Sequence, residues 1–176
     1  ARQVLYNEND IAQPKVKCAS RELRARGTNV IAHQERLTAD NARRLLHGVD
    51  IVLDCSDNFS TRLVVDGVCE SIGVPLVSGA VEKFTGQLAV FTQSTCRYRD
   101  LFPELPKHNL SCAQTGVISH LPGIIGTMQA GEALKLILGL ESASGRLILF
   151  DGLSMALTSV QIPKKMEPCA IASRPI

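Results

Sequence analysis

A run of polar residues, Asp54-Cys55-Ser56-Asp57-Asn58, directly follows the apolar stretch 51–53. A continuous apolar stretch is typical of a parallel strand covered on both faces, and open α/β sheets bind ligands beyond the carboxyl ends of such strands. Asp57 is therefore a candidate ligand for Mg²⁺ on a nucleotide, because Mg²⁺ prefers hard oxygen ligands completed by phosphate. An alternative stays open, in which Asp57 or Ser56 only caps the following helix.

Two cations, Lys15 and Arg62, stand in the first turns of predicted helices. The helix dipole disfavours a positive charge at this position by roughly a few tenths of a kcal/mol, so we expect a compensating group. A bound polyphosphate would compensate both cations. The alternative is a solvated cation beside a surface carboxylate.

Cys112 is the candidate reactive thiol, because it lies in an irregular segment, whereas Cys55 ends a predicted buried strand and Cys18 and Cys69 lie in predicted helices. Exposure favours thiolate chemistry, although a structural or incidental cysteine is an equal alternative. No two of the six cysteines have C-x-x-C spacing, so the chain offers no four-thiolate zinc site.

Length and composition exclude several classes of protein. The 176 residues, 45% of them hydrophobic, are typical of one globular domain. The net charge of +2 argues against a nucleic-acid binder, and no apolar run is long enough to span a membrane. Six cysteines are too few for a disulfide scaffold, so we expect a reducing, cytoplasmic environment.

Hydrophobic periodicity predicts an α/β fold. Helices and strands alternate in the first half, whereas strands follow one another in the second, which predicts a parallel sheet that continues into an antiparallel part. Residues 94–120 have no clear period and form a predicted long crossing loop, which we interpret as a possible lid. The predicted helices span 15–26, 38–48, the stretch after Asn58 to Ile72, and 123–138, and the predicted strands span 29–32, 51–53, 74–77, 86–92, 146–150 and 155–162.

Short motifs occur in order along nearly the whole chain, and together they resemble the ThiF/MoeB/HesA family, the bacterial relatives of ubiquitin-activating enzymes. They are Arg2-Gln3-Val4-Leu5, Gln13-Pro14-Lys15-Val16, Asp54-Cys55-Ser56-Asp57-Asn58 with Thr61-Arg62, Pro75-Leu76-Val77-Ser78-Gly79-Ala80, Gly86-Gln87, Ser111-Cys112-Ala113 with Thr115-Gly116-Val117, and Gln129-Ala130-Gly131-Glu132-Ala133-Leu134-Lys135.

The resemblance implies a Rossmann-like, ubiquitin-activating-enzyme-type fold, with residues 1–176 forming one adenylation-type domain. It also implies ATP- and Mg²⁺-dependent adenylation of the C-terminal glycine of a ThiS- or MoaD-like sulfur carrier, for thiamine, molybdopterin or thiolation pathways. Homodimers and a sulfurtransferase or cysteine desulfurase partner are further implications.

The same resemblance assigns roles to individual residues. Arg2, Gln3 and Lys15 would contact the ATP phosphates, and Asp57 would support Mg²⁺. Asn58 and Arg62 would join the nucleotide-binding residues. Cys112 matches the cysteine that can form a thioester or acyl disulfide with the carrier.

Two departures from the family pattern favour an alternative. The Gly-rich phosphate loop is absent, so we expect an N-terminally truncated domain that binds ATP poorly. The zinc-binding C-x-x-C pairs are also missing: Arg97 and Asp100 stand at the first pair, and Ala172 replaces the partner of Cys169. We therefore expect no structural zinc. The alternative function is an inactive module that binds the carrier or a homodimer partner without catalysis.

Overall fold

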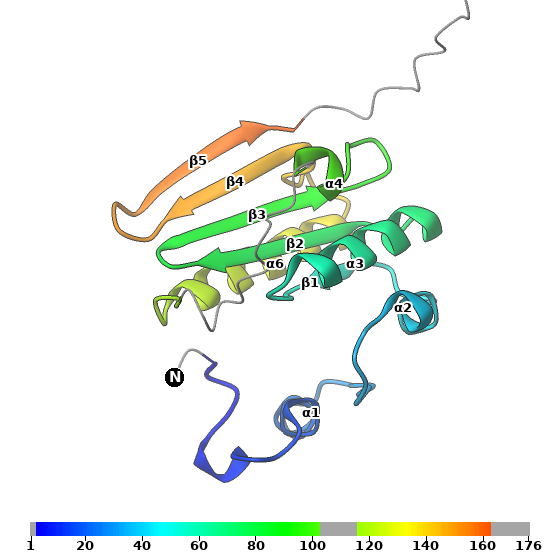
Figure 1. The fold of residues 1–176 in the computed structure, drawn as a ribbon, viewed down its shortest axis with the longest axis vertical. Helices are drawn as coiled ribbons and strands as arrows, with labels where there is room; N and C mark the ends of the chain where they lie inside the picture. The colour runs from blue at the N-terminus through cyan, green and yellow to red at the C-terminus, as the bar shows by residue number, and fades with distance from the viewer. Residues whose placement is uncertain (1–2, 103–115, 163–176) are drawn as a thin grey trace, which may run out of the picture.

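The computed structural model describes residues 3–102 and 116–162. Helical elements precede the first strand, a helix connects the first strand to the second, and the remaining strands follow later in the chain (Figure 1). A short 3-10 helix, η1, spans Glu8–Asp10. The α-helices are α1 (Lys15–Ala25), α2 (Ala39–Leu45), α3 (Phe59–Ile72), α4 (Tyr98–Leu101) and α6 (Leu121–Ile137), and the strands are β1 (Val52–Asp54), β2 (Leu76–Glu82), β3 (Thr85–Phe91), β4 (Arg146–Asp151) and β5 (Ala156–Gln161).

The five strands form one sheet in the order β1-β2-β3-β4-β5. β1 pairs with β2 in parallel, and the other neighbouring strands are antiparallel. Parallel strands require a crossover connection, and α3 connects β1 to β2. The antiparallel pairs β2–β3 and β4–β5 are hairpins. The predicted continuation of a parallel sheet into an antiparallel part is confirmed.

Alternating residues of β2 and β3 build a core on each face of the sheet. Leu76 and Phe91 pack with the α3 and α4 side, whereas Val77, Leu88 and Val90 pack with the α6 side. α6 approaches the sheet closely at Gly86, where an added Cβ would come within 2.5 Å of Ile125 Cδ1. Glycine is required there because any side chain would push the helix away from β3.

The outer edge of β1 differs from the prediction. Leu53 is 42% exposed, so the expectation of a strand covered on both faces is wrong at this residue. The predicted strand at 29–32 does not form, and Ile31 is 80% exposed. A strand needs a neighbour to bond its backbone, and residues 29–32 have no partner strand within 3–102 and 116–162.

The helix starts follow local chemistry. Thr38 and Asn41 form a capping box at the start of α2, which confirms Thr38 as the predicted cap. α6 begins two residues before the predicted start, because Pro122 fits the first turn of a helix. In the described part of the chain, no helix is both long enough and apolar enough to cross a membrane.

In its described residues, the predicted crossing segment 94–120 contains a helix, α4, that periodicity did not reveal. α4 is only four residues long, and Asp100 caps it by accepting the backbone N–H of Arg97 at 2.7 Å. Farther along, Val117 forms a β-bridge with Lys83. Residues 103–115 lie outside the described part, and the interpretation of the segment as a lid stays a prediction.

Candidate functional site

The polar residues 54–58, here called the β1–α3 segment, lie at the carboxyl end of β1. The first residue, Asp54, is buried, and its carboxylate accepts the backbone N–H of Ser56 at 2.9 Å and the Ser78 hydroxyl at 3.3 Å. The last, Asn58, caps α3, since its Oδ1 accepts the Thr61 N–H at 2.9 Å. The open alternative that Asp57 or Ser56 is the cap is therefore wrong, and Asp57 is free of that role.

Arg62 holds the β1–α3 segment from the α3 side. Its guanidinium is buried, lies 3.4 Å from the Asp54 carboxylate, and donates to the Gly79 carbonyl at 3.0 Å and to the Ser56 carbonyl. The compensating group for this cation is thus a buried carboxylate with backbone carbonyls, neither of the two expected partners. The prediction that Arg62 also contacts a nucleotide stays a prediction.

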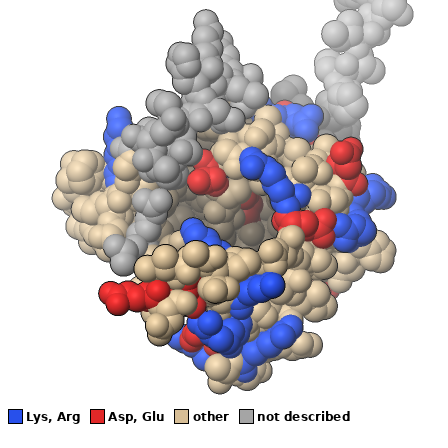
Figure 2. Space-filling model, turned by 60° about the horizontal axis from the view of Figure 1, so that its bottom comes forward, with Lys and Arg blue, Asp and Glu red and all other residues tan. Residues whose placement is uncertain are grey.

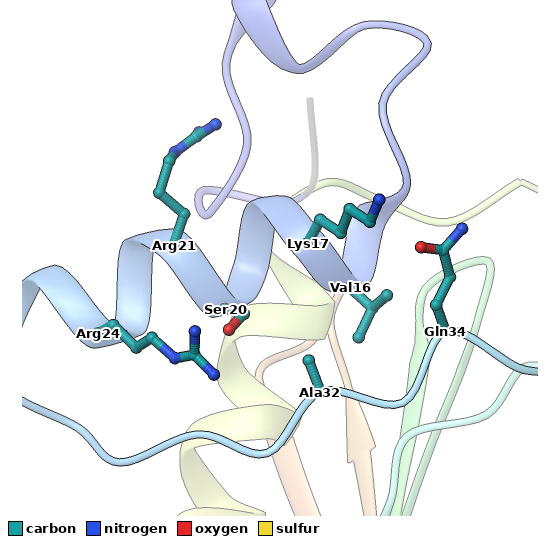
Figure 3. Close-up of a pocket in the computed structure, with 7 residues that line it drawn as sticks. All are labelled: Val16, Lys17, Ser20, Arg21, Arg24, Ala32 and Gln34. Atoms are coloured by element: carbon teal, nitrogen blue, oxygen red, sulfur yellow. The ribbon is translucent and has the colours of Figure 1, made fainter.

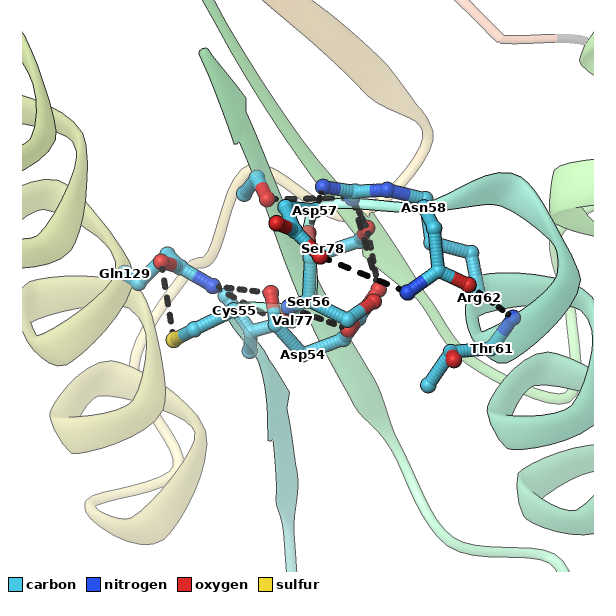
Figure 4. Close-up of polar contacts among 11 residues, drawn as sticks. Asp54, Cys55, Ser56, Asp57, Asn58, Thr61, Arg62, Val77, Ser78 and Gln129 are labelled. Carbon is cyan, nitrogen blue, oxygen red and sulfur yellow. Dashed lines mark hydrogen bonds and ion pairs between the residues drawn. The ribbon is translucent and has the colours of Figure 1, made fainter. Parts of the chain in front are cut away.

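Gln129 of α6 holds the same segment from the opposite side (Figure 4). Its Nε2 donates to the carbonyls of Asp54 at 2.9 Å and Val77 at 3.1 Å. Gln129 opens one of the family motifs, but the sequence predicted no role for it. The signal was present in the sequence, because Gln129 interrupts an apolar stripe between Ile125 and Ala133 at helical spacing.

Asp57 is the exposed carboxylate of the segment. Within the described ranges it forms no ion pair, and its Oδ1 receives only a long contact of 3.4 Å from Asn58 Nδ2. Next to it, Ser56 Oγ is buried with no hydrogen-bond partner among these residues. A carboxylate and a hydroxyl without strong partners fit a Mg²⁺–nucleotide, in which phosphate oxygens complete the coordination.

The N-terminal site residues form a separate group. Lys15 Nζ donates to Gln3 Oε1 at 3.0 Å and lies 5.9 Å from the Tyr6 ring centre. An amide oxygen and an aromatic face accompany this cation, and the expected surface carboxylate is absent from its described surroundings. Gln3, Tyr6 and Lys15 line a hollow of about 540 Å³. Arg2 and Cys112 lie outside the described residues.

No hydrogen bond or ion pair links Gln3 or Lys15 to Asp57, Asn58 or Arg62 in the part of the chain that the structure describes. α1 lies apart from the sheet at the lower end of the molecule in Figure 1. Turned so that this end faces the reader, the surface is deeply hollowed, with acidic and basic side chains around the opening (Figure 2).

A second hollow of about 540 Å³ lies between α1 and residues 32–34 (Figure 3). Lys17, Arg21 and Arg24 give it a basic lining. Arg21 pairs with Asp10 at 2.6 Å, and Arg24 donates to the Val30 carbonyl at 2.7 Å. This hollow contains none of the predicted site residues, so we do not assign it to the nucleotide.

The described cysteines are poor candidates for thiolate chemistry. Burial raises the pKa of Cys18 and Cys96, and raises that of Cys69 to about 11. Cys55 is exposed rather than buried as expected, yet loss of water around its sulfur and the nearby Asp54 carboxylate raise its pKa too. Reactive cysteines need a lowered pKa, which none of these four thiols has. Cys112 and Cys169 lie outside the described residues, so the choice of Cys112 stays a prediction.

A buried ion pair joins α3 to the residue before α4. Arg97 Nη2 lies 2.8 Å from the carboxylate of Asp66, which is fully buried, and donates to the Asp66 carbonyl at 2.9 Å. Arg97 and Asp100 occupy the positions at which the family pattern has its first cysteine pair. Here Arg97 neutralises Asp66 and Asp100 caps α4, so both side chains contribute to the fold.

Asp66 makes stability depend on pH in a defined direction. Burial raises its pKa in the folded state, and Arg97 only partly opposes this. The folded protein then binds the proton more tightly than the unfolded chain, so the contribution of Asp66 is complete below the unfolded pKa of about 3.9 and is lost as pH rises through the folded pKa. Relative to Asp66→Asn, we expect the wild type to lose unfolding free energy as pH rises above 4, measured by urea denaturation. Exposed Asp50→Asn is the control, and a difference that grows with pH in favour of the wild type would contradict this assignment.

The sheet and its helices define a Rossmann-like α/β protein, in which a polar segment stands at the carboxyl end of the parallel strand pair. Comparison with protein families identifies the group: the model described as the ThiF family matches residues 1–171. The chain therefore belongs to the ThiF family, as the motifs predicted.

The chain is similar to named relatives across bacteria and archaea. It is 40% identical to the sulfur carrier protein adenylyltransferase of Thermus thermophilus over 92% of its length and 64% of the relative's. It is 38% identical to the SAMP-activating enzyme E1 of Haloferax volcanii over 95% of its length and 63% of that protein. It is 35% identical to the sulfur carrier protein ThiS adenylyltransferase of Escherichia coli, over 97% of its length and 69% of that protein. The chain thus spans less than two thirds of the first two relatives.

Solved structures support the same fold class. The crystal structure of E. coli MccB with MccA-N7isoASN matches with a TM-score of 0.79 at 15% identity, over 92% of this chain and 52% of MccB. The structure of MccB with ATP matches with a TM-score of 0.73. At this identity the likeness shows the fold alone, and the predicted fold class is confirmed.

Proposed function

We propose that the protein uses ATP and Mg²⁺ to adenylate the C-terminal glycine carboxylate of a ubiquitin-like sulfur carrier of the ThiS or MoaD type, releasing pyrophosphate. Membership of the ThiF family and the names of the relatives from T. thermophilus, H. volcanii and E. coli support the reaction type. The product would serve thiamine, molybdopterin or thiolation chemistry.

The chemical difficulty is that one anion attacks another. The glycine carboxylate must approach the α-phosphate in line, so positive charge has to screen both groups while they are held in place. Lys15, with Arg2 and Gln3, would contact the phosphates. Asp57 would hold Mg²⁺, which would neutralise phosphate oxygens when bound, and Asn58 would join the nucleotide-binding residues.

The single observation that carries the proposal is the contrast within the β1–α3 segment. The Asp54 carboxylate faces inward and is bonded to the protein, whereas the Asp57 carboxylate is exposed and has no ion pair among the described residues. A segment that is fixed on its inner side and offers a carboxylate on its outer side suits a cation that arrives with its substrate.

Two further roles follow by family resemblance. Cys112 would form the covalent link with the carrier in sulfur transfer, with a sulfurtransferase or cysteine desulfurase as sulfur source. The four described cysteines are free thiols, as a reducing cytoplasm would keep them.

Pyrophosphate exchange into ATP by the full-length protein tests the proposal against its alternative. We expect exchange that depends on a carrier ending in glycine and stops when that glycine is removed. Carrier binding without any exchange would instead support the inactive binding module.

We also propose a homodimer that uses the outer face of α6. Apart from Lys135, which pairs with Glu132, the outward-facing residues of this helix carry no charge, and Leu134 and Ile137 are 58% and 65% exposed. Apolar helix faces of this kind are usually covered by a partner. The double variant Leu134→Glu/Ile137→Glu should convert a dimer into monomers in sedimentation velocity, because it buries two charges at the interface. Leu153→Glu, in the exposed turn after β4, is the control and should remain dimeric, and an unchanged dimer in the double variant would refute this interface.

A further inference from the structure

Gln129 is a buried side chain whose every polar group is used at one place, the end of the parallel strand pair. Its carboxamide donates both hydrogens, to the carbonyls of Asp54 and Val77, and its Oε1 lies 3.5 Å from Cys55 Sγ, within reach of the thiol hydrogen. A buried amide is costly unless it is fully hydrogen-bonded, so this orientation is strongly preferred.

The position of the carboxamide depends on Gly79. A Cβ added at Gly79 would lie 2.4 Å from Cδ and Oε1 of Gln129, closer than atoms can approach. The absence of a side chain on β2 thus creates the space that lets Gln129 reach across β2 to the end of β1. On the other side, the Gly79 carbonyl accepts from Arg62.

The strand pairing itself ends just where the site begins. The β1–β2 register stops at Asp54 opposite Ser78, so residues 55–58 have no further strand partner. Gln129 bonds the carbonyl of the last paired residue of β1, and Arg62 bonds the carbonyl of Ser56 from the α3 side. Figure 4 shows these two side chains on opposite sides of the segment.

We infer that Gln129 is a positioning residue for the proposed adenylation. It fixes the end of β1 from the α6 side, so that Asp57 and Asn58 are held at the edge of the sheet where the nucleotide is proposed to bind. This inference rests on the proposed function. Gln129 does not itself contact the substrate. Its effect passes through the backbone of the β1–α3 segment.

The first test measures the segment directly and needs no activity. Gln129→Met keeps the side-chain volume and removes the amide, leaving the Asp54 and Val77 carbonyls without their donor. We expect faster amide hydrogen exchange across residues 54–58 of the full-length protein. Ile125→Val is the matched control, because it loosens packing on the same helix without touching the segment. Unchanged exchange in Gln129→Met overturns the inference.

The second test measures catalysis. Gln129→Met should lower kcat/KM for ATP about tenfold and raise the Mg²⁺ concentration needed for half-maximal rate, because small displacements of positioning groups are costly. Ile125→Val should leave both within about twofold. Equal effects of the two variants, or faster exchange with unchanged kinetics, would overturn the positioning role.

A third variant separates positioning from packing. Gln129→Glu keeps the shape, but its carboxylate would lie against two carbonyl oxygens with the Cys55 thiol alongside, and the Asp54 carboxylate and Arg62 guanidinium lie beyond the segment on its α3 side. Its neutral form can donate one hydrogen bond, so activity relative to wild type should rise as pH falls. A flat ratio contradicts the inference. If the wild type itself shows no carrier-dependent exchange of pyrophosphate, the proposed function fails, and hydrogen exchange alone decides whether Gln129 fixes the segment.

Discussion

Asp57→Asn is expected to lower the rate of carrier-dependent pyrophosphate exchange by about 100-fold, because a neutral amide cannot balance the charge of a divalent cation. The substitution keeps the size of the side chain, and Asp57 is exposed, so folding should be unaffected. The residual activity should also need more Mg²⁺. Steady-state kinetics over a range of ATP and Mg²⁺ concentrations measure both effects.

Asp50→Asn is the control for this prediction. Asp50 is an exposed carboxylate just before β1, and neither the motifs nor the geometry assign it to the site. Its rate should equal that of the wild type. Wild-type kinetics and Mg²⁺ dependence in Asp57→Asn would remove this residue from the metal site.

Arg62→Leu is expected to lower the unfolding free energy by about 3–5 kcal/mol, because it leaves a buried carboxylate without its counter-charge. Asp54 is 4% exposed, and the carbonyls of Ser56 and Gly79 would lose their donor as well. Urea denaturation followed by circular dichroism measures the loss. The double variant Arg62→Leu/Asp54→Asn should be less destabilised than the sum of the two single variants, since the uncompensated charge is gone.

Arg43→Leu provides the matched comparison. Arg43 is exposed and donates to the Ser71 hydroxyl at 3.3 Å, so its loss should cost less than about 1 kcal/mol. Similar losses for the two arginine variants would mean that the Arg62–Asp54 pair contributes little to the fold.

Local pattern was sufficient for the parallel strand pair and for the longer helices of the described chain. The apolar run at 51–53 predicted β1, the helix from Asn58 to Ile72 was predicted to follow it, and the apolar face of 123–138 predicted α6, because each feature depends on residues close in sequence. The Asp54-to-Asn58 run was also placed correctly at the carboxyl end of β1. The parallel edge and its polar loop could therefore be predicted from the sequence.

Features that depend on distant partners could not be predicted in this way. Arg97 neutralises Asp66, 31 residues away, and Gln129 bonds Asp54, 75 residues away. The strand expected at 29–32 failed for the same reason, since a strand forms only beside a partner. Asp66 and Gln129 are polar residues on helical faces that the sequence predicts to be buried. Such a pattern indicates that a polar group is buried, but it does not indicate which distant group forms its hydrogen bond.

The most direct measurement of the central claim is the intact mass of the carrier after incubation with the full-length protein, ATP and Mg²⁺. The account predicts a carrier that gains one adenylyl group, localised to its C-terminal glycine, and no gain with Asp57→Asn at short times. A carrier that binds the protein but keeps its original mass would contradict adenylation and leave a binding module.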